Sequence, residues 1–403
     1  MSSGHFVSHF LTLTLPPLFP FLRVDFGLSY TELGFIMTLY ATATGVFQIP
    51  MGLLVDRIGA FPVMLTGLTV LCSAIAGIGL IESPWALGLL AVLAGSANSV
   101  FHPANYAVLA SVINPARLGR AFGIHTFAGH FGNAVAPITI IFLAVTWGWR
   151  GALVIAGAMG LVVAAAILFG GEADGAEGRA ARGADAQRQG SGVPGHREGQ
   201  APGTLELLFS ARLMKLFLFF LLTAAASNGM QTFSVTALVM LFDTPLVAAS
   251  AALTAFLFAS SIGILVGGVL ADRTGRHDLV AALAFALTAA IIALVGSVAV
   301  PAFILILLLT TAGLLQGIIR PARDMLVHAA APEGSTGRVF GFVTTGINVG
   351  AALTPPALGW LVDHDAAEWV FWFIACAMVL ALATVLMTRE PSAQDGAVGE
   401  ENR

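Results

Sequence analysis

One motif occurs twice in this sequence, as Gly52-Leu53-Leu54-Val55-Asp56-Arg57-Ile58-Gly59 and again as Gly268-Val269-Leu270-Ala271-Asp272-Arg273-Thr274-Gly275. The interval from Asp56 to Asp272 is 216 residues. Further pairs follow at an interval of 218 residues: Phe101-His102-Pro103 with Ile319-Arg320-Pro321, Gly119-Arg120 with Gly337-Arg338, Phe122-Gly123 with Phe340-Gly341, Gly132 with Gly350, and Pro137 with Pro355. Because matches kept in register over this length rarely arise by chance, the sequence predicts two halves related by duplication.

The composition is typical of a protein that lies in a lipid bilayer. Hydrophobic residues make up 57% of the 403 residues and charged residues 10%, whereas roughly a quarter of the residues in soluble domains are charged. A soluble core cannot bury that much apolar surface, so the sequence predicts a polytopic membrane protein. The two cysteines, Cys72 and Cys376, lie inside apolar runs and indicate neither a disulfide framework nor a metal site.

Twelve apolar stretches are long enough to cross a bilayer, since a helix needs roughly 20 residues to span its hydrocarbon core. They cover about residues 5–22, 32–54, 62–82, 84–110, 120–144, 149–171, 212–238, 246–270, 278–298, 301–330, 338–362 and 367–387. The expected fold is all-α, with six-helix bundles at 1–171 and 205–388, a cytoplasmic linker at 172–204 and a cytoplasmic tail at 389–403. The linker and the tail are polar and lack helical periodicity, a composition typical of disorder.

The basic residues predict the orientation, because cytoplasmic loops carry an excess of lysine and arginine. With both termini in the cytoplasm, most arginines lie in cytoplasmic loops, and only Arg23 and Arg150 face outward. The external loops then hold the acidic residues Asp25, Glu82, Asp243, Asp363, Asp365 and Glu368. We therefore expect a multi-pass protein of the inner (plasma) membrane, with the lipid bilayer as its surroundings.

The duplicated motif resembles the cytoplasmic loop signature of the major facilitator superfamily, and it lies at equivalent places in both predicted halves. The resemblance implies two six-helix bundles and gating loops that latch the halves together on the cytoplasmic side. The residues that inherit this role are Gly52, Asp56, Arg57, Gly59, Gly268, Asp272, Arg273, Gly275 and Arg276. Glycine permits a tight turn and close helix approach, while Asp and Arg make charge-assisted bonds at helix ends.

A second likeness, carried by Gly95-Ser96-Ala97-Asn98-Ser99-Val100-Phe101-His102-Pro103 and Gly129-His130-Phe131-Gly132-Asn133, is to the fosmidomycin-resistance-type branch of that superfamily. Ser8-His9 in the first span fits this branch as well. The chain differs from the branch at Leu13 and Ala104, where acidic residues occur in other members. The likeness implies an amphiphilic, drug-like compound as one substrate class.

Polar side chains recur at helical spacing inside several apolar spans. Asn98, His102 and Asn105 do so in span 4, His5, His9 and Thr12 in span 1, and Thr126, His130 and Asn133 in span 5. The predicted substrate-binding residues are Arg320, Gln316, His102, Asn98, Asn105, His9, His130, Asn133, Asn228, Gln231 and Asn348. The alternative for each is a helix-to-helix hydrogen bond, worth about 0.6 kcal/mol in a membrane.

Three charges end the apolar run of the tenth span, in Gln316-Gly317-Ile318-Ile319-Arg320-Pro321-Ala322-Arg323-Asp324. A charged side chain at bilayer depth costs roughly 2.5–3.5 kcal/mol on insertion scales, so such a residue usually serves a site. Gln316 and Arg320 share a helical face with the predicted charge network of Arg323 and Asp324. The alternative is a helix end whose arginines extend to the lipid headgroups.

These observations predict a secondary active transporter that works by alternating access and is functional as a monomer. Arg320 suits a small organic anion, because its forked guanidinium matches carboxylate or phosphate. The sequence contains no nucleotide-binding loop or hydrolase motif, so we expect neither an enzyme nor a cofactor, metal or nucleic-acid partner. Two alternatives remain, a non-transporting membrane sensor or receptor on the same scaffold and a passive facilitator.

Coupling to protons is a further open point of the sequence. Spans 1 and 4 contain no Asp or Glu between Phe6 and Leu22 or between Trp85 and Ala110. Asp324 follows Arg323, and this neighbour favours its ionised form. If protons are carried, we expect His102 to titrate, with His9 or His130 as relay; the alternative is facilitated or exchange transport without a proton.

Overall fold

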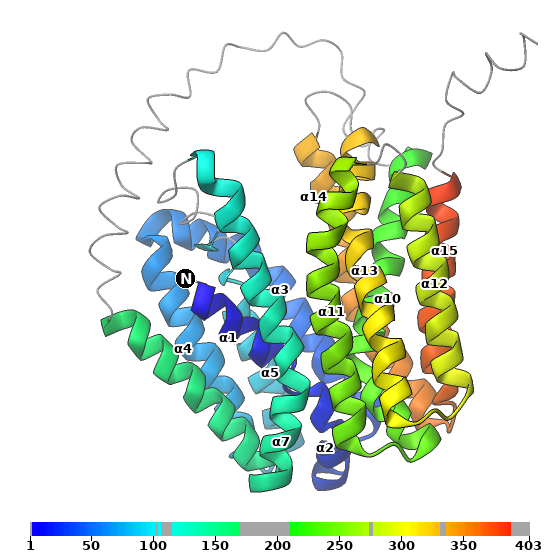
Figure 1. Ribbon diagram of the computed structural model, residues 1–403. Coiled ribbons are helices and arrows are strands. Elements are labelled where there is room, and N and C mark those ends of the chain that lie inside the picture. The colour runs from blue at the N-terminus through cyan, green and yellow to red at the C-terminus, as the bar shows by residue number, and fades with distance from the viewer. Residues whose placement is uncertain are drawn as a thin grey trace, which may run out of the picture.

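The computed structural model describes residues 2–101, 104–105, 115–169, 210–273, 277–330 and 336–387. Within these ranges every regular element is helical (Figure 1). The first half contains α1 (Ser2–Thr12), η1 (Pro16–Leu18), α2 (Phe19–Phe26), α3 (Tyr30–Ile58), α4 (Ala60–Ile78), α5 (Pro84–Asn98) and α7 (Pro115–Phe169). The second half contains α10 (Ala211–Phe242), α11 (Leu246–Arg273), α12 (His277–Ser297), α13 (Ala302–Ala330), α14 (Thr336–Asp363) and α15 (Glu368–Met387).

Seven of the described helices are long and apolar enough to cross a membrane, and two shorter ones, at Pro84–Asn98 and Glu368–Thr384, are also apolar. One of the seven, α7, covers two predicted spans: it has two helical arms that meet at Gly148, whose φ of 73° lies outside the helical range and kinks the chain there. The first predicted span is also divided. α1 ends at Thr12, and the chain continues through η1, which begins at Pro16, into α2.

The predicted span 4 is interrupted, contrary to the continuous helix expected over residues 84–110. α5 ends at Asn98, and helical geometry returns at Phe101, Ala104 and Asn105. The hydroxyl of Ser99 donates to the carbonyl of Ser96 at 2.6 Å. Such local bonds from serine to the backbone compete with the regular helical pattern, which accounts for a break at this point.

The packing of the two halves repeats. α3 packs on α5 as α11 packs on α13, α1 on α7 as α10 on α14, and α4 on α5 and α7 as α12 on α13 and α15. Gly95 lies so close to the carbonyl of Tyr40 that a side chain would overlap it, and Gly313 lies in the same way against the carbonyl of Phe256. The two contacts are equivalent: Gly95 and Gly313 are 218 residues apart and Tyr40 and Phe256 are 216 apart, the same intervals that separate the repeated sequence motifs.

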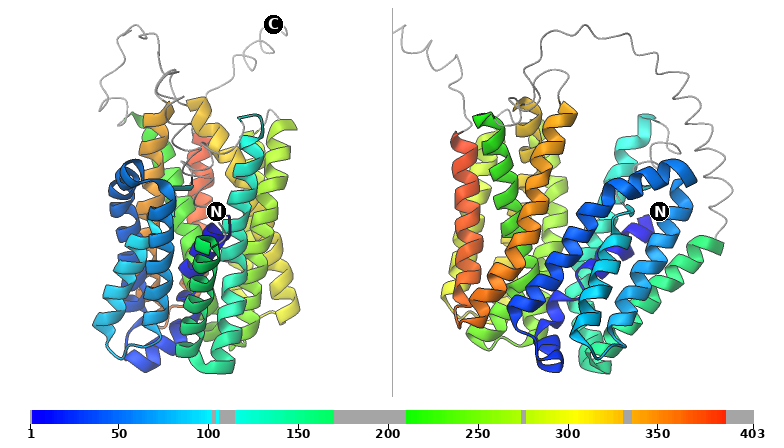
Figure 2. Two further views of the ribbon diagram at one scale, coloured as in Figure 1. Left: turned by 90° about the vertical axis from the view of Figure 1, so that its left-hand side faces the viewer. Right: turned by 180° about the vertical axis from the view of Figure 1, so that it is seen from behind.

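The two bundles meet at one end of the molecule and diverge toward the other, as the view from behind shows most clearly (Figure 2). Across the halves, α3 packs on α14 and α7 packs on α11. The fold is therefore two six-helix bundles joined chiefly through two helix pairs. The predicted linker at 172–204 and the predicted tail at 389–403 lie outside the described residues.

Candidate functional site

Four histidine side chains from α1 and α7 lie in contact in the first bundle. His5 and His125 stack with ring centroids 4.1 Å apart and an angle of 12° between the ring planes. His5 and His9 meet edge to face at 4.5 Å, and the rings of His9 and His130 are 6.2 Å apart. The sequence prediction placed His9 and His130 in the site and left out His5 and His125, although His5 lies one helical turn before His9 on the same polar face.

Two of the predicted asparagines bond to this histidine cluster. Nδ2 of Asn105 lies 3.2 Å from Nδ1 of His5, and Nδ2 of Asn133 lies 3.0 Å from Nδ1 of His9. Asn105 is only 2% exposed, and its Oδ1 has no hydrogen-bond partner in the part of the chain that the structure describes. Residues from the polar faces predicted for spans 1, 4 and 5 thus come together in one network, in which His5, His125 and Asn105 are buried and His9, His130 and Asn133 are half-buried.

Gly129 allows the histidines of α1 to approach α7 closely. A side chain on Gly129 would lie 2.6 Å from Nε2 of His5 and 3.0 Å from Cδ2 of His9. On the same face of α1, the hydroxyl of Thr12 lies 2.8 Å from the hydroxyl of Tyr40, which ties α1 to α3. Only glycine at this position of α7 leaves room for both imidazole rings.

The histidine cluster is arranged for hydrogen bonding and ring stacking. The Nδ1 atoms of His5 and His9 face amide groups, and the flat face of His5 covers His125. Within the described residues, no group of three or more His, Cys, Asp or Glu side chains is placed to hold a metal ion.

The predicted polar residues outside this cluster are more dispersed. Gln316 of α13 is buried at 4% exposure. Asn228 and Gln231 of α10 are half-buried, and the amide of Gln231 donates to the hydroxyl of Ser227 at 3.2 Å. Asn348 of α14 is exposed, and Asn98 at the end of α5 is half-buried. These residues are spread over four helices, whereas the histidine cluster gathers its side chains between α1 and α7.

The predicted charged residues lie partly beyond what the structure describes. Arg320, Arg323 and Asp324 are on the single helix α13 with Gln316, as expected, but their side chains are outside the described part. His102 lies outside the described residues altogether. The role of this group as a substrate-binding and charge network remains a prediction.

The gating-loop residues divide between helix ends and turns. Gly52, Asp56 and Arg57 lie in the last turns of α3, and Gly268, Asp272 and Arg273 lie in the last turns of α11. Gly59 joins α3 to α4 with a φ of 93°, a conformation that favours glycine. The side chains of Asp56, Asp272 and Arg273 are not described, and Gly275 and Arg276 lie outside the described residues.

Backbone groups beside prolines in α7 and α14 form hydrogen bonds with the opposite half. Pro356 has no N–H, so the carbonyl of Ala352 lacks its usual helical donor; the hydroxyl of Thr38 in α3 donates to this carbonyl at 2.5 Å. Next to Pro137, the backbone N–H of Ile138 donates to the hydroxyl of Thr254 in α11 at 3.2 Å. Both helix pairs that join the halves are therefore pinned by polar bonds beside a proline.

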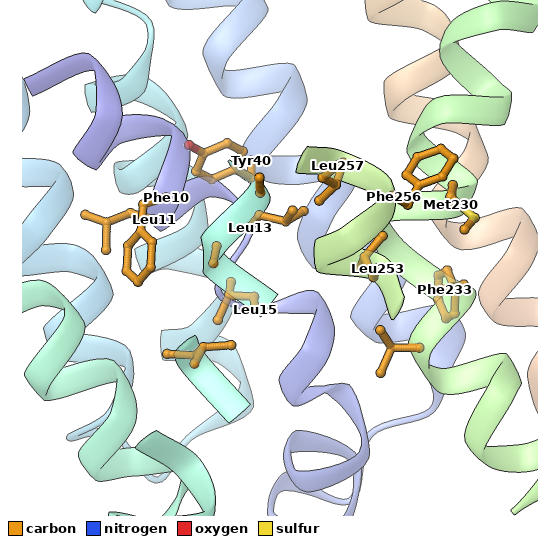
Figure 3. Close-up of a cluster of buried hydrophobic side chains, with 14 of the residues drawn as sticks. Phe10, Leu11, Leu13, Leu15, Tyr40, Met230, Phe233, Leu253, Phe256 and Leu257 are labelled. Carbon is orange, nitrogen blue, oxygen red and sulfur yellow. The ribbon is translucent and has the colours of Figure 1, made fainter. Parts of the chain in front are cut away.

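An apolar cluster lies between the halves (Figure 3). Figure 3 shows Leu13, Leu15 and Tyr40 of the first half on the side toward Leu253 and Leu257 of the second, with Phe10 and Leu11 deeper in the first bundle and Met230, Phe233 and Phe256 deeper in the second. All ten are less than a tenth exposed. The ring of Phe19 also packs on Phe233, with centroids 5.4 Å apart. We call these ten residues the apolar plug, because they are buried and apolar where the bundles meet.

The residues predicted for the external loops gather at one end of the molecule. Arg150 forms a 2.9 Å ion pair with Asp25 and donates to the carbonyl of Ile81. The guanidinium of Arg23 lies over the ring of Tyr30, 4.9 Å from its centroid. Tyr30 begins α3, whose first turn contacts Asp363 at the end of α14. This is the end at which the bundles meet.

A cavity of about 500 Å³ lies between α1 and the two arms of α7. Phe6, Val7 and Phe10 of α1 line one side, and side chains such as Val135, Met159 and Val163 of α7 line the other. Ser2 and Ser3 supply the polar groups at its margin. α1 therefore separates an apolar cavity from the histidine cluster, and its two faces differ in polarity.

Known proteins resemble this chain over nearly its whole length. The fosmidomycin resistance protein of Escherichia coli (strain K12) is 24% identical over 96% of this chain and 91% of its own length. The membrane sensor protein UhpC of the same strain is 24% identical over 95% of this chain and 89% of its own length. The crystal structure of a mutant of the nucleoside transporter NupG has a TM-score of 0.73 at 14% identity, covering 96% of this chain and 98% of that one.

The family model of the Major Facilitator Superfamily matches residues 1–250 and again 219–402. The likeness to NupG at 14% identity shows the fold alone. The two matched ranges agree with the two six-helix bundles and the repeated loop motif. The chain therefore belongs to the Major Facilitator Superfamily of membrane transporters.

Proposed function

We propose that this transporter moves a small amphiphilic or anionic organic compound across the inner membrane by alternating access. The observation that carries the proposal is that the contacts between halves are concentrated at one end. Three contacts join the bundles there: Asp363 of α14 bonds to α3, Thr254 of α11 bonds to α7, and the apolar plug lies between the halves. Rocking two bundles about a central site exposes that site to each side in turn.

By the arginine asymmetry of the sequence, the closed end lies outside the cell, so this arrangement corresponds to an inward-open state. The acidic and aromatic contacts of Arg23 and Arg150 belong to that external end. Opening toward the outside then requires that the plug separates and that the opposite, cytoplasmic ends of the bundles come together through the gating loops.

Two features support an amphiphilic substrate. The 500 Å³ cavity beside α1 is mostly apolar, while the histidine cluster on the opposite side of α1 offers hydrogen-bonding groups. A ligand site typically combines an apolar lining with a few convergent polar groups. The relative named for fosmidomycin resistance supplies a first test compound. An anionic group on the substrate would bind Arg320, as the sequence predicts.

The decisive measurement is flux in proteoliposomes that contain the purified full-length chain. Radiolabelled fosmidomycin on one side is exchanged against unlabelled compound on the other, with and without a pH gradient. Exchange without gradient-driven accumulation identifies facilitated or exchange transport, and accumulation identifies proton coupling. Empty liposomes and the variant Arg320→Gln are the matched comparisons, because Gln keeps polarity and removes the charge.

A sensor is the second candidate function, favoured by one comparison. UhpC is named a membrane sensor protein, and the likeness covers 95% of this chain. A sensor binds its ligand without moving it. Binding of a compound in a thermal-shift assay, together with no exchange of the same compound in proteoliposomes, would identify the chain as a sensor and contradict transport.

A further inference from the structure

His5 and His125 form the closest ring contact of the histidine cluster, and both are at least nine-tenths buried. We propose that this stacked pair, together with Asn105, binds a single proton and releases it during the transport cycle. The inference rests on the transport function proposed above and adds to it the site of the coupled ion. It differs from the sequence prediction, which favoured His102 and left His5 and His125 out.

The hydrogen bond to Asn105 fixes the tautomer of His5. An amide NH₂ group only donates, so Nδ1 of His5 accepts from Nδ2 of Asn105, and the neutral ring carries its hydrogen on Nε2. Protonation adds a hydrogen at Nδ1, which then faces the amide hydrogens. Half a turn of the Asn105 amide brings Oδ1 to that hydrogen, and Oδ1 is buried with no hydrogen-bond partner within the described residues.

Stacking limits the pair to one proton. The rings are nearly parallel, with centroids 4.1 Å apart. Two imidazolium rings at this separation repel strongly where both are at least nine-tenths buried. One imidazolium on the face of a neutral imidazole is favourable, because the neutral ring offers a π-face to the cation. The pair therefore titrates as a unit rather than as two independent groups.

Within the described residues, the titratable groups around the pair are histidines, a tyrosine and a cysteine. His9 contacts His5 along α1, and His130 follows on α7. From α3, Tyr40 reaches α1 through Thr12, and from α4, Cys72 lies against Gly160 of α7. Neither α1 nor α7 contains an Asp or Glu, and Arg117 and Arg120 in the first turns of α7 have side chains outside the described part. Among the described residues, histidines are therefore the titratable groups that contact the pair directly, and His102 lies outside these residues.

The two helices that hold the pair also hold the halves together. α7 contacts α11 through the rings of Phe131 and Phe258, 6.1 Å apart, and through the Ile138–Thr254 bond. α1 continues into the plug through Phe10, Leu11 and Leu13. A change in the charge of the pair and in the orientation of the Asn105 amide therefore acts on the helices that close the external end. Coupling requires such a connection, because proton binding must favour one of the two transporter conformations over the other.

The first test counts protons and needs no substrate. The full-length chain in lipid nanodiscs, with ¹⁵N-labelled histidine, is titrated by NMR from about pH 5 to 8, the range in which histidine ordinarily changes charge. The variants His5→Gln and His125→Gln assign the NMR signals of the two rings. If only one variant folds, it still identifies the signals of the pair, because either substitution removes the stacking. We expect the two rings to share one single-proton step, which His364→Gln leaves unchanged because His364 is exposed and bonds to Trp360. Two independent one-proton steps, or no titration in this range, would overturn the proposal.

The second test separates this inference from the proposed function. In proteoliposomes with fosmidomycin, His5→Gln should lose accumulation driven by a pH gradient, and counterflow exchange by the same variant measures any loss of substrate binding. Accumulation equal to that of the wild type contradicts the proton site and leaves the transport function intact. If wild-type protein moves no fosmidomycin, the substrate proposal fails, and the NMR titration still decides whether the pair binds one proton.

Discussion

The carboxylate of Asp363, the last residue of α14, caps the first turn of α3 through Thr31, 332 residues earlier in the chain. Its Oδ2 accepts the backbone N–H of Thr31 at 2.8 Å and the Thr31 hydroxyl at 2.6 Å. Its Oδ1 accepts the N–H of Tyr30 at 2.8 Å. Carboxylates are favourable at a helix N-terminus, where unpaired N–H groups and the helix dipole attract negative charge. The local capping box of Ser29 and Glu32 satisfies the N–H of Glu32, and Asp363 of the opposite half adds acceptors for the N–H groups of Tyr30 and Thr31.

Replacing Asp363 by Asn should favour opening of the external end. The amide keeps one acceptor but loses the charge, which is worth about 1 kcal/mol at a helix N-terminus, or roughly a fivefold change in the population of the open form. The measurement is the spin–spin distance between labels at Ser83→Cys and Val247→Cys, one in each half. Cys376→Ser removes the exposed cysteine, and the buried Cys72 stays.

The matched control is Asp365→Asn, two residues further along. Asp365 is exposed, and its φ of 55° is one that Asn tolerates well. The Asp365→Asn substitution should leave the distribution of distances between the two spin labels unchanged. An equal effect of both substitutions would mean that net charge at this end matters and that the cap on α3 does not.

Thr254→Val should loosen α7 from α11. The substitution keeps the shape of the side chain but leaves the N–H of Ile138 without its acceptor, at a cost of about 1 kcal/mol for a partly buried group. Hydrogen–deuterium exchange of the segment containing Ile138 should accelerate by roughly fivefold. Thr254→Ser retains the oxygen and should exchange at the wild-type rate. No difference between Val and Ser would show that the bond does not restrain α7.

Leu257→Ala should weaken the apolar plug. Leu257 is 8% exposed and faces Leu13 across the halves (Figure 3). Truncating a buried leucine costs about 2 kcal/mol or more, through lost apolar contact and the cavity left behind. The same pair of spin labels should report a larger fraction of molecules with a separated external end. Leu265→Ala, on the same helix but 56% exposed, should have little effect.

The duplication, the loop motif and most helices could be predicted from the sequence, because these depend on local composition and on register. The polar faces that carry Asn105, His9, His130 and Asn133 could also be predicted, because helical spacing sets these residues on them. The stacking of His5 on His125 depends on where α1 lies against α7, which local spacing does not specify. Likewise, nothing near Asp363 in sequence indicates that it caps α3, and the break after Asn98 arises from serine bonds to the backbone that periodicity does not show.

Gly313→Ala and Gly95→Ala should destabilise the protein by similar amounts, because duplicated packing puts each against a carbonyl of the neighbouring helix. A methyl group on Gly313 overlaps the carbonyl oxygen of Phe256, and one on Gly95 overlaps that of Tyr40. Overpacking of this kind costs about 1–3 kcal/mol, so both variants should lower the thermal midpoint in detergent by several degrees. Gly88→Ala is the control, since its methyl group meets Ile36 at an ordinary 3.7 Å and alanine favours the helix by up to about 1 kcal/mol. A loss of thermal stability for Gly95→Ala with none for Gly313→Ala would contradict the equivalence of the two helix pairs. Equal losses would show that the repeated positions contribute equally to the stability of the two bundles.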